Sequence, residues 1–192
     1  MSCASCAFVF HPSWLCAMKA LFSFVVMIVL LLVLGVVGFS RAHQAAKMAE
    51  VPENLRQLYE GAVHYAHRYL RGPIHQRLRT SFPASSGITP ESTCCVGTRA
   101  TPCVPGGKGP TGYNPEEWKK PPFVDFAFEF KDPHLFRYSF LSGVPAAEIS
   151  FEVSAYGDAD CDGLLSRWYR KGVVREDFVG GPLEIFTEHP EE

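Results

Sequence analysis

EISFEVSAY, residues 148–156, decides the fold class because its apolar and polar side chains alternate strictly. Every second residue from Ile149 to Ala155 is apolar, and Glu or Ser stands between them. This period of two is typical of a β-strand with one buried and one exposed face. Similar patterns predict further strands at 123–130, 135–140, 168–174 and 183–187. Residues 123–192 are therefore expected to form an antiparallel sheet of four or five strands.

A sheet with one apolar face needs a cover, and an amphipathic helix upstream can supply it. Apolar side chains recur there at three- and four-residue steps and form one stripe: Leu55, Leu58, Tyr59, Ala62, Ala66 and Tyr69. We expect Pro52 to kink or interrupt this helix and Gly72-Pro73 to end it. The predicted amphipathic helix occupies residues 40–72 and packs on the sheet. Glu60, His64 and His67 have metal-ligand spacing, but a solvent-facing stripe gives the same pattern.

Residues 73–122 are rich in Pro, Gly, Ser and Thr, which predicts a long surface loop. The loop contains Cys94, Cys95 and Cys103, and Cys161 lies in a later turn. Cysteines confined to loops favour disulfides and an oxidising compartment, and adjacent cysteines pair poorly with each other. We therefore expect Cys103 and Cys161 to pair with Cys94 and Cys95, one each, and the assignment is open. Zinc is the alternative, although the CxxC spacing is missing.

The turn DADCDGLLS, residues 158–166, resembles the first part of an EF-hand calcium loop. Carboxylates stand at positions one, three and five and Gly at position six, while position seven needs only its backbone carbonyl. The predicted calcium ligands are Asp158, Asp160, Asp162, Leu164 and Ser166. Position twelve is Tyr169 in place of a bidentate Glu, which predicts a weak site. The alternative is an acidic turn without an ion.

The run Ala20–Phe39 holds no charge and no proline, and a helix of that length would span about 30 Å. We expect a transmembrane helix at 20–39, preceded by a short segment at 1–19, and a single-pass inner-membrane protein. A cleaved signal peptide ending near Ser40-Arg41-Ala42 is the alternative. The cysteines place the head, residues 123–192, in the periplasm or on the cell surface, whereas the positive-inside rule would place it in the cytoplasm. Whether Met1 or Met18 starts the chain is open.

Several of these segments together resemble type IV pilins and pseudopilins. The strongest match is FSRAHQAAKMAEVPENLRQLYEGA, residues 39–62, followed by FPASS at 82–86, the Cys94-Cys95 pair and GDADCDG at 157–163. The resemblance implies a pilin-like α+β fold, in which a long N-terminal membrane-spanning helix continues into an amphipathic helix packed on an antiparallel sheet. It also implies other pilin-like subunits as partners. The chain departs from the prepilin pattern at Ala20 and Val25, where the family has Gly and Glu.

The remaining features favour a structural or binding role over catalysis. The 18 basic and 20 acidic residues give a net charge of −2, and no nucleic-acid-binding signature is present, so no nucleic-acid partner is expected. GxSxG, HExxH, P-loop and dinucleotide-binding patterns are absent from the sequence, and we expect no enzyme. The first hypothesis is a membrane-anchored pilin-like subunit of a type IV pilus or secretion-type pseudopilus, serving adhesion, motility or assembly. The alternative is a non-polymeric membrane-anchored extracytoplasmic binding module.

Overall fold

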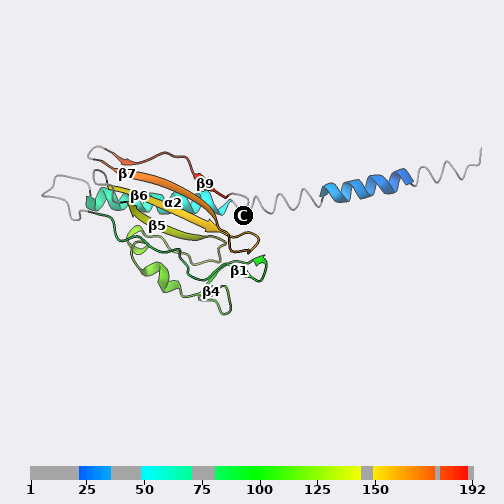
Figure 1. The fold of residues 1–192 in the computed structure, drawn as a ribbon, viewed down its shortest axis with the longest axis horizontal. Helices are drawn as coiled ribbons and strands as arrows, with labels where there is room; N and C mark the ends of the chain where they lie inside the picture. The colour runs from blue at the N-terminus through cyan, green and yellow to red at the C-terminus, as the bar shows by residue number, and fades with distance from the viewer. Residues whose placement is uncertain (1–21, 36–48, 71–80, 144–148, 176–177, 190–192) are drawn as a thin grey trace, which may run out of the picture. The chain divides into compact units, whose positions relative to one another are not determined.

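A computed structural model describes residues 22–35, 49–70, 81–143, 149–175 and 178–189 (Figure 1). The chain divides into two units, residues 1–46 and residues 47–192. Each unit has its own internal contacts.

In the first unit, the structure describes one apolar helix at residues 22–35. Its 14 residues rise about 21 Å, whereas the hydrocarbon core of a bilayer is roughly 30 Å thick. Within the described residues, no helix is both long enough and apolar enough to cross a membrane. The predicted fold class, with its long membrane-spanning helix, and the predicted single-pass inner-membrane localisation were therefore wrong. Both predictions needed the whole run 20–39 as one helix, and residues 20–21 and 36–39 lie outside the described part.

The second unit begins with α2, Glu50–Tyr65, which continues as the π-helical turn η1, Ala66–Leu70. The acidic residues Glu50 and Glu53 stand in the first turn, where the helix dipole favours them. Pro52 also lies in this first turn, where its missing N–H has no partner to lose, so the expected interruption was wrong. Leu58 and Ala62, in the predicted apolar stripe, are fully buried.

The sheet consists of β5 (Arg137–Gly143), β6 (Ile149–Gly157), β7 (Ser166–Val174), β8 (Val179–Gly180) and β9 (Phe186–Glu188). All of its pairs are antiparallel, in the order β5-β6-β7-β8, and β9 also pairs with β7. β8 and β9 pair with opposite ends of β7, at residues 173–174 and 167–169. Two of these strands, β6 and β7, closely follow the predicted ranges 148–156 and 168–174.

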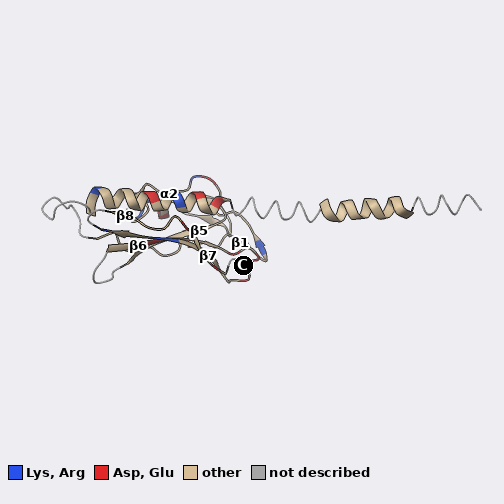
Figure 2. Cartoon of the chain, turned by 90° about the horizontal axis from the view of Figure 1, so that it is seen from above, with Lys and Arg blue, Asp and Glu red and all other residues tan. Residues whose placement is uncertain are grey.

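The helix α2 lies on one face of this sheet, and the hydrophobic core fills the space between them (Figure 2). Two glycines permit the close packing. A Cβ on Gly61 of α2 would collide with the backbone of Phe126, and a Cβ on Gly172 of β7 would collide with the ring of Phe151. On its solvent side, α2 carries an exposed ion-pair chain in which Arg56 contacts Glu53 and Glu60, each at 2.7 Å.

Polar residues of the first turn connect α2 to the start of β5. The Asn54 side-chain amide donates to the Tyr138 hydroxyl at 2.9 Å, and this hydroxyl donates to Glu50 at 3.3 Å. Glu50 also accepts the backbone N–H of Leu135 at 3.1 Å. Burial raises the pKa of Glu50, against the opposing effect of these hydrogen bonds. These contacts join the N-terminal part of α2 to β5 and to the residues just before it.

The strand predicted at 123–130 is absent, and this prediction was wrong. A 3₁₀ turn, η4 (Val124–Phe126), begins the segment, and Ala127 follows in the left-handed conformation with φ 55°. The neighbouring edge of β5 is already occupied, because Thr89 exchanges backbone hydrogen bonds with Tyr138 at 2.7 and 2.8 Å. Phe126 and Phe128 are buried all the same. The alternation of apolar residues at 123–130 therefore reflects burial of these side chains, although the segment does not pair with a strand of the sheet.

Residues 81–122 wrap around the β5 side of the sheet and contain only short elements. β1 (Cys95–Val96) and β2 (Arg99–Ala100) form an antiparallel pair, whereas β3 (Val104–Pro105) and β4 (Gly112–Tyr113) pair in parallel. The 3₁₀ helix η3 (Pro115–Lys119) follows, and the Asn114 side chain caps it by accepting the Glu116 N–H at 3.0 Å. This segment carries three of the cysteines.

Candidate functional site

Two disulfides involve residues 81–122: one closes a loop within this segment, and the other joins it to the turn after β6. Cys94 bonds to Cys103, nine residues further on, and Cys95 bonds to Cys161 across 66 residues. The predicted set of paired cysteines is confirmed, and the structure resolves the assignment that the sequence left open. In the chain-entropy description, closing the longer loop stabilises the fold by about 4 kcal/mol and the shorter by about 2.5 kcal/mol. The long-range bond fixes the acidic turn against the loop.

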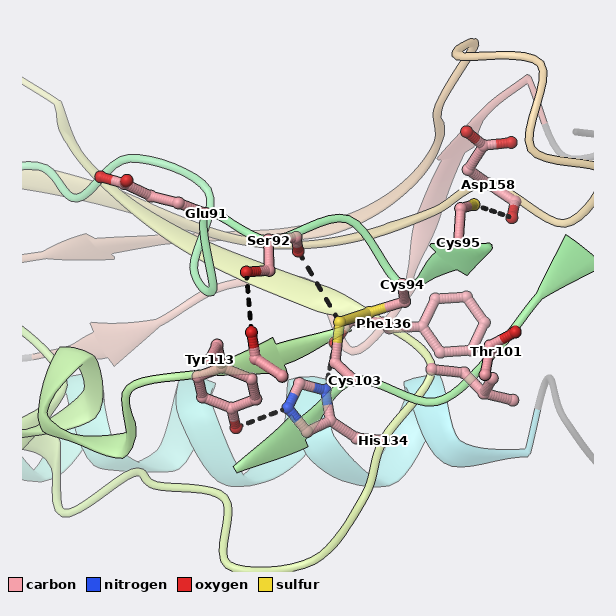
Figure 3. Close-up of a disulfide and its surroundings, with 12 residues drawn as sticks. Glu91, Ser92, Cys94, Cys95, Thr101, Cys103, Tyr113, His134, Phe136 and Asp158 are labelled. Carbon is pink, nitrogen blue, oxygen red and sulfur yellow. Dashed lines mark hydrogen bonds between the residues drawn. A yellow bond between two sulfur atoms is a disulfide. The ribbon is translucent and has the colours of Figure 1, made fainter. Parts of the chain in front are cut away.

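A buried histidine lies beside the short disulfide (Figure 3). His134 Nδ1 lies 2.7 Å from the Phe136 carbonyl oxygen, and its Nε2 lies 2.8 Å from the Tyr113 hydroxyl. The Trp118 indole N–H donates to the same hydroxyl at 2.9 Å. A proton on Nδ1 satisfies all three groups, because the Tyr113 hydroxyl then donates to Nε2. The sequence offered no signal for this network beyond the residue types.

Burial decides the charge state of this network. It lowers the pKa of His134 to about 4, although the hydrogen bond to Phe136 acts in the opposite direction. Burial also raises the pKa of Tyr113 to about 12. Both groups are therefore neutral at neutral pH. Cys161 has no free thiol, because its sulfur is in the disulfide with Cys95.

The acidic turn brings three predicted calcium ligands together. Carboxylate oxygens of Asp158, Asp160 and Asp162 lie within 4.8 Å of one another. Asp158 Oδ2 accepts the Gly163 N–H at 3.1 Å, and Asp162 Oδ1 accepts the Leu164 N–H at 2.7 Å. Asp158 Oδ1 is shielded from solvent and has no hydrogen-bond partner. Gly163 has φ +97°, a conformation that favours glycine.

Other members of the predicted site are less favourable. Leu164 is exposed, and Ser166 is buried as the first residue of β7. Tyr169, at position twelve, stacks on Phe186 with ring centroids 5.4 Å apart and provides no carboxylate. Burial lowers the pKa of Arg137, and the negative charge of Asp158 opposes this effect. The Arg137 guanidinium is therefore a cation that already interacts with the acidic turn. Among the described residues, Glu60, His64 and His67 do not gather as a metal-binding group.

The sequence did not predict an open pocket at the β7 edge of the sheet, the edge opposite β5, which we call the edge pocket. It has a volume of about 570 Å³ and is lined by Tyr59 and Val63 of α2, Arg170 of β7, and Phe178, Leu183 and Ile185 of the chain around β8 and β9. Arg170 pairs with Val153 in the sheet register and shares its helix-facing side. The same period of two that identified β7 places position 170 inward with Trp168, which is the signal that was available.

Comparisons of this chain with protein-family models, with curated proteins and with solved structures found no match in any of the three.

Proposed function

We propose that this chain is a pilin-like structural subunit that associates with further pilin-like subunits through its apolar helix, residues 22–35. The observation that carries the proposal is the exposure of that helix. Its large apolar side chains are between 40% and 72% exposed. A helix that is apolar on every side is stable in water only when other apolar surface covers it. The same helix of a second copy offers a surface of matching length.

The second unit serves in this proposal as a non-catalytic head. The four described cysteines are held in disulfides, and the buried histidine is neutral and engaged at both ring nitrogens. A tightly packed aromatic core and a covalently held loop suit a unit that keeps its shape within an assembly. We expect no nucleic-acid partner, in keeping with the net charge of −2.

The proposal is tested by the assembly state of the full chain. Electron microscopy and sedimentation should find filaments or large oligomers, which Leu31→Glu should reduce to monomers because it introduces a charge into the apolar contact. Leu141→Glu is the matched control, since Leu141 is 51% exposed on β5 of the second unit, against 61% for Leu31. A wild-type chain that stays monomeric at high concentration would contradict assembly and favour the alternative, a non-polymeric binding module.

Calcium is the cofactor that we propose for the acidic turn. Three gathered carboxylates and the buried, unpartnered Oδ1 of Asp158 support it. Calorimetry of the full chain should detect calcium binding that disappears in Asp158→Asn combined with Asp160→Asn. Asp132→Asn, an exposed aspartate outside the turn, should leave binding intact. If the wild-type protein shows neither heat nor a calcium-dependent rise in Tm, the residues form a turn alone.

A further inference from the structure

The edge pocket contains a cation, Arg170, that has no anionic partner among the residues that the structure describes. Arg170 is only 6% exposed, and its Nε–H is buried without a hydrogen-bond acceptor. The guanidinium lies 4.0 Å from the centre of the Tyr59 ring, and one terminal nitrogen donates to the Pro182 carbonyl at 3.5 Å. Within the described part of the chain, no carboxylate lies within ion-pair distance of it.

This arrangement is costly for a buried charge. A guanidinium has five N–H donors, and a nearly buried one is normally satisfied by a carboxylate or by several carbonyls. The Tyr59 ring offsets part of the cost through a cation–π contact. Arg56, an exposed arginine that also lines the pocket, forms ion pairs with Glu53 and Glu60. Arg170 therefore retains the capacity to bind an anion that enters the pocket.

The walls of the pocket specify the rest of the ligand. Phe178 is 46% exposed and Leu183 is 88% exposed, although both are large apolar side chains beside a buried cation. Tyr59 and Val63 extend the apolar wall along α2. The volume of about 570 Å³ falls within the usual range for small-molecule sites. A ligand with an apolar body would cover these side chains.

We propose that the edge pocket binds a small monocarboxylate with an apolar chain, with its carboxylate on Arg170 and its chain along Phe178 and Leu183. A monoanion fits better than a dianion because Arg56, the other arginine that lines the pocket, is already held by two glutamates. The planar guanidinium matches a carboxylate in geometry. Binding at this site does not require assembly of the chain.

Calorimetric titration of the full chain with octanoate tests the proposal. Octanoate should bind, whereas octylammonium, which has the same chain and the opposite charge, and acetate, which lacks the chain, should not. Arg170→Gln should weaken octanoate binding about tenfold or more, the effect of losing one charge-assisted contact. Lys171→Gln is the matched control, because this neighbouring β7 residue is exposed and does not line the pocket.

A second variant keeps the test decisive if Arg170→Gln fails to fold. Leu183→Asp adds a negative charge at an exposed part of the pocket and should also weaken octanoate binding about tenfold, while Leu183→Asn should weaken it less. Equal binding of octanoate and octylammonium would overturn the proposal, as would unchanged affinity in Arg170→Gln. It would also be overturned if octanoate failed to bind and Leu183→Asp instead dissociated a dimer, because the occupant would then be a second copy.

Discussion

The two edges of the sheet are closed in different ways. Along the β5 edge, Ser86 and Thr89 make backbone hydrogen bonds to the strand, and the Cys95–Cys161 disulfide anchors the same segment further on. Along the β7 edge, β8 covers two residues and β9 covers three, and residues 170–172 of β7 lie between these pairings. The edge pocket lies on this second side.

The difference shows how one sheet can separate stability from recognition. An unpaired strand edge invites association and must be covered or interrupted. At the β5 edge the cover is covalently held and contributes to stability. At the β7 edge the cover is short, and the edge pocket, lined by apolar side chains and Arg170, lies there. Changes at the first edge should therefore lower stability, and changes at the second should affect mainly binding.

The largest effect is expected from the bond that anchors the β5 cover. Replacing Cys95 and Cys161 together by Ser should lower the free energy of unfolding by about 4 kcal/mol, because the unfolded chain loses its longest loop constraint. The matched change at Cys94 and Cys103 should cost about 2.5 kcal/mol, since its loop is shorter. Urea unfolding measures both. Equal losses in the free energy of unfolding would contradict the expectation that the bond closing the longer loop stabilises the fold more.

Acid should weaken the β5 side through His134. The pKa of His134 is about 4 in the folded chain and 6.5 ordinarily, so the unfolded chain binds the proton more tightly. The stability that the chain has with a neutral His134 is complete above pH 6.5, and it is lost as the pH falls from 6.5 towards 4 because the unfolded chain takes up the proton first. The loss amounts to about 3 kcal/mol.

Denaturant unfolding at several pH values measures this loss. His134→Gln should lower stability at neutral pH and remove most of the pH dependence in that window. The exposed His64 supplies the control, and His64→Gln should leave the dependence unchanged. A pH profile that is the same with and without His134 would assign the acid sensitivity to other groups.

A smaller effect is expected from one hydrogen bond of the cover. Ser86 Oγ accepts the backbone N–H of Phe140 at 2.8 Å. Ser86→Ala leaves that half-buried group unpaired and should cost about 1 kcal/mol in thermal or urea unfolding. Ser85→Ala removes a similar bond to Ser142 at an exposed position and should cost less, because water replaces it. A larger loss of stability from Ser85→Ala than from Ser86→Ala would contradict the interpretation that this segment shields the β5 edge from water.

The smallest stability effect is expected at the β7 edge. Leu183→Asp should change the free energy of unfolding by less than about 0.5 kcal/mol, because the side chain is 88% exposed. The buried leucine Leu58 gives the contrast, and Leu58→Ala should cost about 2–5 kcal/mol. A large loss from Leu183→Asp would mean that the β7 edge also depends on its cover for stability.

Local patterns in the sequence predicted what neighbouring residues decide among themselves. The period of two located β6 and β7 to within two residues, and the helical stripe identified the buried side of α2. The alternation at 123–130 misled, because alternation reports burial and does not reveal whether a strand edge is free. The apolar run at 20–39 predicted a membrane-spanning helix, whereas within the described residues the helix at 22–35 is too short to cross a membrane.

By itself, the sequence determined the positions of the main strands, the amphipathic helix and the set of cysteines that form disulfides. Tertiary structure alone decided which cysteine bonds to which, how His134 is hydrogen-bonded, and that Arg170 lies buried against the Tyr59 ring. The physical reason is the distance along the sequence between the residues that interact. Periodicity depends on residues a few positions apart, whereas these contacts join segments from separate parts of the chain, whose meeting depends on the packing of the whole unit.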